Sequence, residues 1–243
     1  MPELEPKIVV FLCDWSSHPG AGVEVTKVPC SAKVDAGIIL KEFLGGADGV
    51  LVPGCHPDDC QHVSGKLRTE RNMKVSRTLM GEVGLDPERL LFEWVSPDEE
   101  AEFAGLMREF TERIRKLGPQ GSECNIEKGE LGMRLKGAVD AVGSKRLRWL
   151  VGKERGLVSR ENMFGETVPQ EFYDAVTDEA VKEEYLASTI TLLLSEETMS
   201  VKELASKIGA SPDEVLLSIM DMRTMGKVSV TEVRGKSPVY RLK

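Results

Sequence analysis

Four cysteines near the start of the chain are the residues best suited to chemistry. They are Cys13, Cys30, Cys55 and Cys60, and the 243-residue sequence holds five cysteines in all. Four thiolates match the ligand set of a 2Fe–2S or 4Fe–4S cluster, or of a structural zinc ion. The C-x4-C spacing of the last pair is less specific than paired C-x2-C motifs. Spacing alone therefore leaves open the alternative that these cysteines are small buried hydrophobes.

The sequence predicts a β-strand before each of three cysteines. The strands end at a cysteine in each case and cover residues 7–13, 23–30 and 47–55. The carboxyl ends of neighbouring parallel strands meet at one edge of a sheet, where ligands bind. We therefore expect the three cysteines to meet there. Cys60 follows Cys55 closely, just before a predicted helix.

Strands and helices alternate through residues 1–118. Helices are predicted at residues 34–44, from about residue 59 to 82, and from 96 to 117, with a fourth strand at residues 90–95. Ser96 and Glu99 form a capping-box pattern, and Gly118 stops this last helix. Its apolar face consists of Phe103, Leu106, Met107, Phe110, Ile114 and Leu117. The alternation predicts an α/β domain, a small parallel sheet flanked by helices.

The composition changes after residue 118, and we place a domain boundary there. Residues 119–197 read as a helical region, basic over residues 131–151. Residues 198–243 predict a winged helix-turn-helix, with a capping box at its start, two short helices and a two-stranded wing. The second of these helices carries or adjoins three methionines, for which core packing is the expected role: Met220, Met222 and Met225.

Charge and hydropathy exclude several classes of protein. The net charge is −8 and the sequence pI is about 5.2, which argues against a protein whose main task is to hold nucleic acid. No apolar run is long enough to span a bilayer, and the first residues lack a signal-peptide pattern. We expect a cytoplasmic protein, in which cysteines are more often ligands, catalytic or buried than disulfide-bonded.

Several residues around the cysteines have two interpretations each. His56 and His62 lie on either side of Cys60 and could ligate iron, as in Rieske centres, or serve as hydrogen-bond donors or plain loop residues. Trp15 could shield a cluster from water or pack at its rim. Cys124 lies in the linker and is expected to be a free thiol. The helix after Cys60 carries cations that could offset cluster charge or face an acidic partner: Lys66, Arg68, Arg71, Lys74 and Arg77.

Residues 7 to about 118 resemble a known family, the delta subunit of methyl-viologen-reducing hydrogenase. The resemblance rests on Phe11-Leu-Cys-Asp-Trp-Ser16, on Cys30, on the string Gly46-Ala-Asp-Gly-Val-Leu-Val-Pro-Gly-Cys-His-Pro-Asp-Asp-Cys60, and on Glu70-Arg71. It implies a 2Fe–2S cluster held by Cys13, Cys30, Cys55 and Cys60. It also implies a non-catalytic role in electron relay. The partners would be a flavin-containing, heterodisulfide-reductase-type A subunit and an oxidoreductase such as a hydrogenase or formate dehydrogenase.

One position departs from the family pattern. The family has Cys-x-Trp-Cys at the end of the first strand, whereas this chain has Ser16 at the second cysteine position. Four cysteines then remain as the simplest ligand set. The alternative is that Ser16 oxygen or a histidine completes the set.

Two rival functions come from other classes. The first is a cytoplasmic regulator that senses metal or redox state and binds DNA through its winged helix. Against it, Asp213, Glu214 and Asp221 accompany a single Arg223 on the second helix, a charge pattern that favours docking to protein. The second rival is a scaffold with a structural zinc site.

Overall fold

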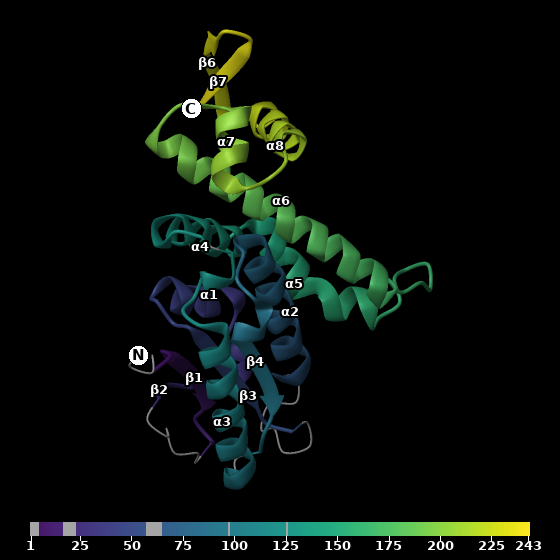
Figure 1. Cartoon of the computed structure of the whole chain (residues 1–243). Coiled ribbons are helices and arrows are strands. Elements are labelled where there is room, and N and C mark those ends of the chain that lie inside the picture. Colours follow the sequence, from purple (N-terminus) through teal and green to yellow (C-terminus); the bar gives the residue numbers. More distant parts are fainter. Residues whose placement is uncertain (1–4, 17–22, 57–64, 97, 125) are drawn as a thin grey trace. The chain divides into compact units, whose positions relative to one another are not determined.

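The chain folds into two compact units in this computed structural model (Figure 1). The first unit is Met1–Leu135 and the second is Lys136–Lys243. The described residues are 5–16, 23–56, 65–96, 98–124 and 126–243. Within these ranges, no helix combines the length and the apolar composition needed to cross a membrane. The boundaries that the sequence places after residues 118 and 197 stay predictions.

A four-stranded sheet forms the centre of the first unit, and its strands are all parallel. They are β1 (Ile8–Cys13), β2 (Glu24–Val28), β3 (Gly49–Gly54) and β4 (Leu90–Trp94), in the spatial order β2-β1-β3-β4. β1 and β3 are central and buried along their whole length, whereas β2 lies at an edge and is partly exposed. The sequence prediction of a small parallel sheet flanked by helices is confirmed.

Helices cover both faces of this sheet (Figure 1). α1 (Ala36–Leu44) packs against α2 (Gly65–Val83) and against β3, and α2 also contacts β4. α3 (Glu100–Leu117) packs on the opposite face. There it contacts the face of β1 that carries Ile8, Val10 and Leu12, since side chains alternate between the two faces along a strand. The cluster under α3 includes Ile8, Val10, Leu12, Leu51, Leu91, Phe103, Met107, Phe110 and Ile114.

The start of α3 differs from the prediction. The sequence pattern places the N-cap at Ser96, but the helix begins at Glu100 with Glu99 as its N-cap. A turn precedes it, in which the Glu99 N–H donates to the Ser96 carbonyl at 3.1 Å. The Ser96 N–H in turn donates to Glu99 Oε2 at 2.7 Å. The side-chain contact of a capping box is therefore made within this turn, before the helix starts.

The second unit begins with helices. α4 (Lys128–Val142) crosses from the first unit into the second, and α5 (Lys145–Val158) and α6 (Gln170–Glu196) follow. The basic stretch at residues 131–151 is thus divided between two helices, because Ser144 Oγ accepts the Leu147 N–H at 3.1 Å and starts a new one. α4 and α6 approach closely: a Cβ on Gly137 would lie 2.2 Å from Thr189 Oγ1.

The C-terminal segment combines two short helices with a small antiparallel sheet. Its elements are β5 (Met199–Ser200), α7 (Val201–Ile208), α8 (Pro212–Thr224), β6 (Val228–Arg234) and β7 (Ser237–Leu242), with sheet order β5-β7-β6. The predicted capping box is confirmed, since Ser200 and Glu203 exchange hydrogen bonds at the start of α7. The winged-helix designation stays a prediction.

The methionines of α8 correct one expectation. Met222 is buried with Val215 and Ile219, as expected for a core residue. Met220 is 56% exposed and Met225 is 69% exposed, so core packing is wrong for both. A face with exposed apolar side chains does not match a DNA-reading helix, which presents cations to phosphates.

A buried arginine ties the amino-terminal edge of the sheet together. Arg89 precedes β4 and is fully buried. Its Nε and Nη2 atoms each donate to a Glu123 carboxylate oxygen at 2.8 Å. The guanidinium also donates to four backbone carbonyls: Asp48 at 3.0 Å, Leu117 at 3.3 Å, Gly118 at 2.9 Å and Pro119 at 3.0 Å. Segments before β3, after α3 and before α4 therefore share one cation.

Glu123 is the counter-ion in this network. Partial burial raises the pKa of its carboxyl, but hydrogen bonds from the Arg89 side chain and the Asp86 N–H outweigh that effect, and the pKa lies below its ordinary value of 4.5. Glu123 is thus a carboxylate at neutral pH, paired with a guanidinium that has no access to water.

Glu123→Gln should destabilise the protein by about 3–5 kcal/mol, because it leaves the Arg89 charge buried without a counter-charge. Urea unfolding followed by circular dichroism measures this. Glu88→Gln is the matched control: Glu88 pairs with Arg113 at the same 2.8 Å, but both side chains are exposed. That change should cost at most about 1 kcal/mol. Equal losses from the two variants would contradict the proposed importance of burial.

The contribution of Glu123 should also depend on pH. Because its pKa is lower in the folded chain than in the unfolded chain, the stabilisation is complete above the unfolded pKa and is lost as pH falls through the folded pKa. The difference in unfolding free energy between the natural chain and Glu123→Gln should therefore shrink as pH is lowered from about 6 to about 3. A difference that stays constant over this range would show that Glu123 acts without its charge.

Candidate metal centre

Three cysteines lie at the carboxyl ends of three adjacent strands, as the sequence predicts. Cys13 is the last residue of β1, Cys55 directly follows β3, and Cys30 comes two residues after β2. In the sheet, Cys13 pairs with Val28 on one side. Continuing the β1–β3 register from Val10 and Leu51 brings Cys13 opposite Gly54 on the other side. Neighbouring strands are about 4.8 Å apart, so the three cysteines share one short stretch of sheet edge.

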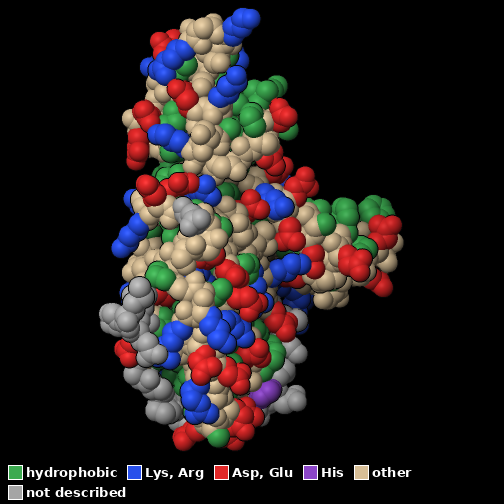
Figure 2. Space-filling view, in the orientation of Figure 1, with side chains coloured by type: hydrophobic (Ala, Val, Ile, Leu, Met, Phe, Trp, Pro, Cys, Tyr) green, Lys and Arg blue, Asp and Glu red, His purple; other side chains and the backbone are tan. Residues whose placement is uncertain are grey.

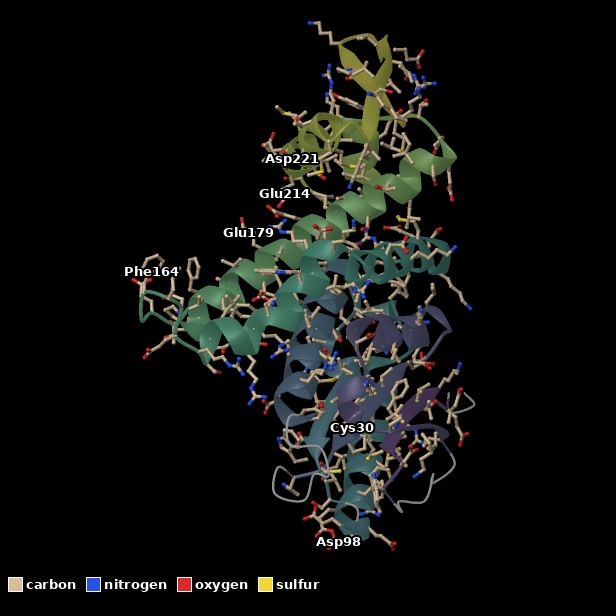
Figure 3. The ribbon with its side chains drawn as sticks, turned by 180° about the vertical axis from the view of Figure 1, so that it is seen from behind. Cys30, Asp98, Phe164, Glu179, Glu214 and Asp221 are labelled. Atoms are coloured by element: carbon tan, nitrogen blue, oxygen red, sulfur yellow. The ribbon has the colours of Figure 1, made fainter. Side chains whose placement is uncertain are left out.

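This edge is only partly accessible to solvent. Cys13 and Cys30 are each 7% exposed, and Cys55 is half-buried. Cys13 Sγ donates to the Pro29 carbonyl at 3.6 Å, which links the end of β1 to the residue before Cys30. Figure 3 labels Cys30 in the first unit. Thiolate sulfur in such an environment suits iron or zinc, and its burial limits the access of water.

The described residues do not form a complete ligand set. Within them, no three His, Cys, Asp or Glu side chains lie close enough together to hold a metal ion. Cys60 and His62 lie outside the described residues. The chemistry of the three described donors fits an iron–sulfur cluster, because all three are thiols from adjacent strand ends and C-terminal strand edges are ligand sites in α/β sheets.

Buried polar residues of α2 hold the turn that contains Cys30. Cys30 opens a 3-10 turn at Ser31–Lys33. Asn72 Nδ2 donates to the Val34 carbonyl at 3.0 Å, and Ser31 Oγ lies 3.4 Å from Thr69 Oγ1. Asn72 and Thr69 are buried. Sequence reasoning missed this support, although the i, i+3 spacing of polar residues in an amphipathic helix was a usable signal.

An aromatic pair lies beside the residue that precedes Cys55. Phe92 and Trp94 on β4 form an edge-to-face pair with ring centroids 4.7 Å apart. A Cβ at Gly54 would lie 2.9 Å from the Phe92 ring and 3.0 Å from the Trp94 ring. Close packing against this pair therefore favours glycine before Cys55, and a larger residue must displace the two rings or the strand end that carries the thiol.

The residue that follows Cys55 contacts the N-cap residue of α3. His56 Nε2 lies 3.3 Å from Glu99 Oε2, the same oxygen that accepts the Ser96 N–H. The N-cap residue of α3 thereby restrains the chain immediately after Cys55. Of the two interpretations of His56, this pairing agrees with a supporting residue beside the cysteine.

Other residues singled out in the sequence lie in varied settings. Trp15 is 63% exposed, so most of its ring faces solvent. The Ser16 N–H donates to the Cys13 carbonyl at 2.8 Å and the Ser16 carbonyl accepts from Lys27 Nζ at 2.6 Å, so this position closes the turn after β1. Cys124 is exposed, in a short 3-10 turn near Gly84. Cys124 directly follows Glu123, the partner of Arg89, and does not lie at the strand ends that carry the other described cysteines.

Comparison with known proteins identifies relatives of the first unit. A family model described as "Methyl-viologen-reducing hydrogenase, delta subunit" matches residues 8–118. The iron-sulfur D subunit of F420-non-reducing hydrogenase from Archaeoglobus profundus is 40% identical over 129 residues, which is 48% of this chain and 94% of that protein. The corresponding iron-sulfur protein of Methanococcus voltae is 34% identical over 47% of this chain and 88% of its own length.

A further relative is a much larger protein. Part of the A subunit of ferredoxin:CoB-CoM heterodisulfide reductase from Methanosarcina mazei is 35% identical to this chain over 134 residues. That alignment covers 50% of this chain and 17% of the larger protein. A stretch related to this chain therefore also occurs inside a longer heterodisulfide reductase polypeptide.

Asn72→Ala should loosen the Cys30 turn. Removing the amide leaves the buried Val34 carbonyl without this donor. The free energy of unfolding, measured in urea, should therefore fall by about 1–3 kcal/mol. Thr111→Ala is the control, because it removes a side-chain hydrogen bond within a single helix, to the Met107 carbonyl, and should change stability by less than about 0.5 kcal/mol. Similar values for both variants would mean that α2 does not position the turn.

Proposed function

Since this chain belongs to the family of the methyl-viologen-reducing hydrogenase delta subunit, we propose that it is an electron-transfer subunit carrying a 2Fe–2S cluster. The proposed ligands are Cys13, Cys30, Cys55 and Cys60. The cluster would relay electrons between a heterodisulfide-reductase-type flavoprotein and an oxidoreductase such as a hydrogenase or formate dehydrogenase. The chain itself would catalyse no bond-making step.

The observation that carries this proposal is the placement of Cys13, Cys30 and Cys55 at adjacent strand ends. Each of three adjacent strands has a cysteine at or just after its carboxyl end. Core packing alone does not account for this placement. The names of the relatives support iron–sulfur chemistry, because several are called iron-sulfur subunits.

Protein residues would prepare this edge for electron transfer. A bound iron–sulfur cluster supplies a site that takes up and releases single electrons. The burial of Cys13 and Cys30 keeps water from their sulfur atoms, while half-buried Cys55 leaves one side open towards a partner. Exposed Arg68, in the first turn of α2, would lessen the negative charge of a four-thiolate site.

The proposed partners follow from the relatives. The M. mazei protein contains a stretch related to this chain within a heterodisulfide reductase A subunit, so the two parts are covalently joined there. The A. profundus relative is a hydrogenase subunit of about the size of the matched region. We therefore propose that this chain works between an A-type subunit and an oxidoreductase.

Cys13→Ser, Cys30→Ser and Cys55→Ser should each lose most of the bound iron and sulfide, because serine oxygen is a poor replacement for a thiolate at iron. Anaerobic purification followed by iron and sulfide assays and electron paramagnetic resonance of the reduced protein measures this. Two irons and two sulfides per natural chain would agree with a 2Fe–2S cluster.

Cys124→Ser is the matched control and should keep the full cluster, since Cys124 directly follows Glu123, the partner of Arg89, and does not lie at the strand ends that carry the other described cysteines. One zinc per chain without sulfide would contradict the proposal and favour a structural zinc site. Full iron and sulfide in Cys55→Ser would remove that residue from the ligand set. Salt-sensitive binding of the natural chain to duplex DNA would favour the regulator instead.

A further inference from the structure

At the carboxyl end of the sheet, one row of residues leads from Cys13 to the edge strand β4. Gly54 is the register partner of Trp94 on one side. The continued β1–β3 register places Cys13 on the other side of Gly54. β4 is the last strand in the order β2-β1-β3-β4 (Figure 1). From the edge of the sheet inwards, the row is therefore Trp94, Gly54 and Cys13.

The side chains of Trp94 and Cys13 lie on the same face of the sheet. Side chains alternate between the two faces along each strand. Leu12 of β1 and Leu91 of β4 both pack in the cluster under α3. Cys13 is one residue beyond Leu12, and Trp94 is three residues beyond Leu91. Both therefore face the opposite side of the sheet, which α1 and α2 cover.

Gly54 leaves the space between these two side chains to the aromatic rings of β4. A Cβ at Gly54 would lie 2.9 Å from the Phe92 ring and 3.0 Å from the Trp94 ring. The rings therefore occupy the place that a side chain at Gly54 would take. That place is the position next to Cys13 in the row, so the rings lie on the β4 side of the thiol.

The aromatic pair forms a fixed boundary between the thiol and the surface. The Val95 N–H donates to the Gly54 carbonyl at 2.8 Å and holds the backbone beside Trp94 against β3. Phe92 and Trp94 are half-buried, whereas Cys13 is 7% exposed. On the face of the first unit seen in Figure 2, hydrophobic side chains reach the surface only in small groups among charged ones. The pair thus separates a largely charged exterior from a buried sulfur atom.

We propose that Phe92 and Trp94 form the apolar wall of the metal centre on its β4 side, and that Trp94 is a positioning residue that limits the access of water to Cys13. This inference rests on the proposed function, because the wall is assigned to the cluster that Cys13 would hold. The apolar surroundings of an iron–sulfur centre control the access of solvent, which in turn affects the reduction potential.

The direction of this effect follows from charge. The reduced form of a four-thiolate cluster carries one more negative charge than the oxidised form. Water stabilises the larger charge better than aromatic rings do. A wall that excludes water therefore holds the reduction potential at a lower value than an open edge would.

Trp94→Ala should shift the reduction potential of the loaded full-length chain to a more positive value, because water takes the place of the ring. Redox titration followed by electron paramagnetic resonance measures the midpoint. Trp94→Phe keeps a ring at this position and should restore most of the natural potential. Trp149→Ala is the matched control: Trp149 lies on α5 in the second unit, is 55% exposed, and should leave the potential unchanged.

Thiol labelling of the metal-free full-length chain tests the wall without the cluster. In Trp94→Ala, Cys13 should react with N-ethylmaleimide at least about 10-fold faster than in the natural chain, as measured by mass spectrometry of its peptide. Cys30 is the internal control, because it is also 7% exposed but follows β2, on the other side of β1. Phe92→Leu keeps most of the apolar volume and should act in the same direction by a smaller amount.

The outcomes separate this inference from the proposed function. If Trp94→Ala changes only one of the two measurements, or neither, the wall is wrong and the electron-transfer role stands. Equal acceleration of labelling at Cys13 and Cys30 would mean that the variant loosens the whole edge, which also overturns the inference. If the natural chain holds no iron and no sulfide, the proposed function fails, and the assignment of the wall to a cluster fails with it.

Discussion

The buried Arg89–Glu123 pair is the constraint on which the first unit depends. One guanidinium connects the segment before β3, the end of α3 and the turn before α4 through its carboxylate partner and four carbonyls. Breaking a buried pair leaves an uncompensated charge, so these segments form one cooperative unit. The network lies at the amino-terminal edge of the parallel strands, whereas the cysteines lie at the carboxyl edge. The buried ion pair and the candidate metal site therefore lie at opposite ends of the same sheet.

The carboxyl edge is built from smaller interactions that act on individual thiols. Asn72 fixes the turn that follows Cys30, and the Phe92–Trp94 pair demands glycine before Cys55. These contacts come from α2 and β4, which are separated in sequence from the residues they restrain. The positions of Cys30 and Cys55 thus depend on elements that are distant in the sequence.

The sequence predicted the alternation of strands and helices well, because buried parallel strands such as β1 (Ile8–Cys13) are continuous apolar runs. It could not predict the role of Arg89, since four of its acceptors are backbone carbonyls, which leave no pattern in side-chain types. Met220 was misplaced because α8 has apolar residues on both its buried and its exposed faces, so periodicity does not separate them. Met225 was misplaced because it is the C-cap residue, beyond the last residue of the helix. For the candidate site, strand ends predicted which thiols share an edge, but the supporting hydrogen bonds depend on tertiary contacts.

Because Cys13, Cys30 and Cys55 come from three strands, they become neighbours only when the sheet has formed. In the unfolded chain, intervening segments of many residues separate them, and closing two loops at once has a large entropic cost. A group that binds all three sulfur atoms would therefore bind the assembled sheet more tightly than the unfolded chain, and its binding would be coupled to the folding of the first unit. Loading would raise the free energy of unfolding, and unfolding would release the bound group.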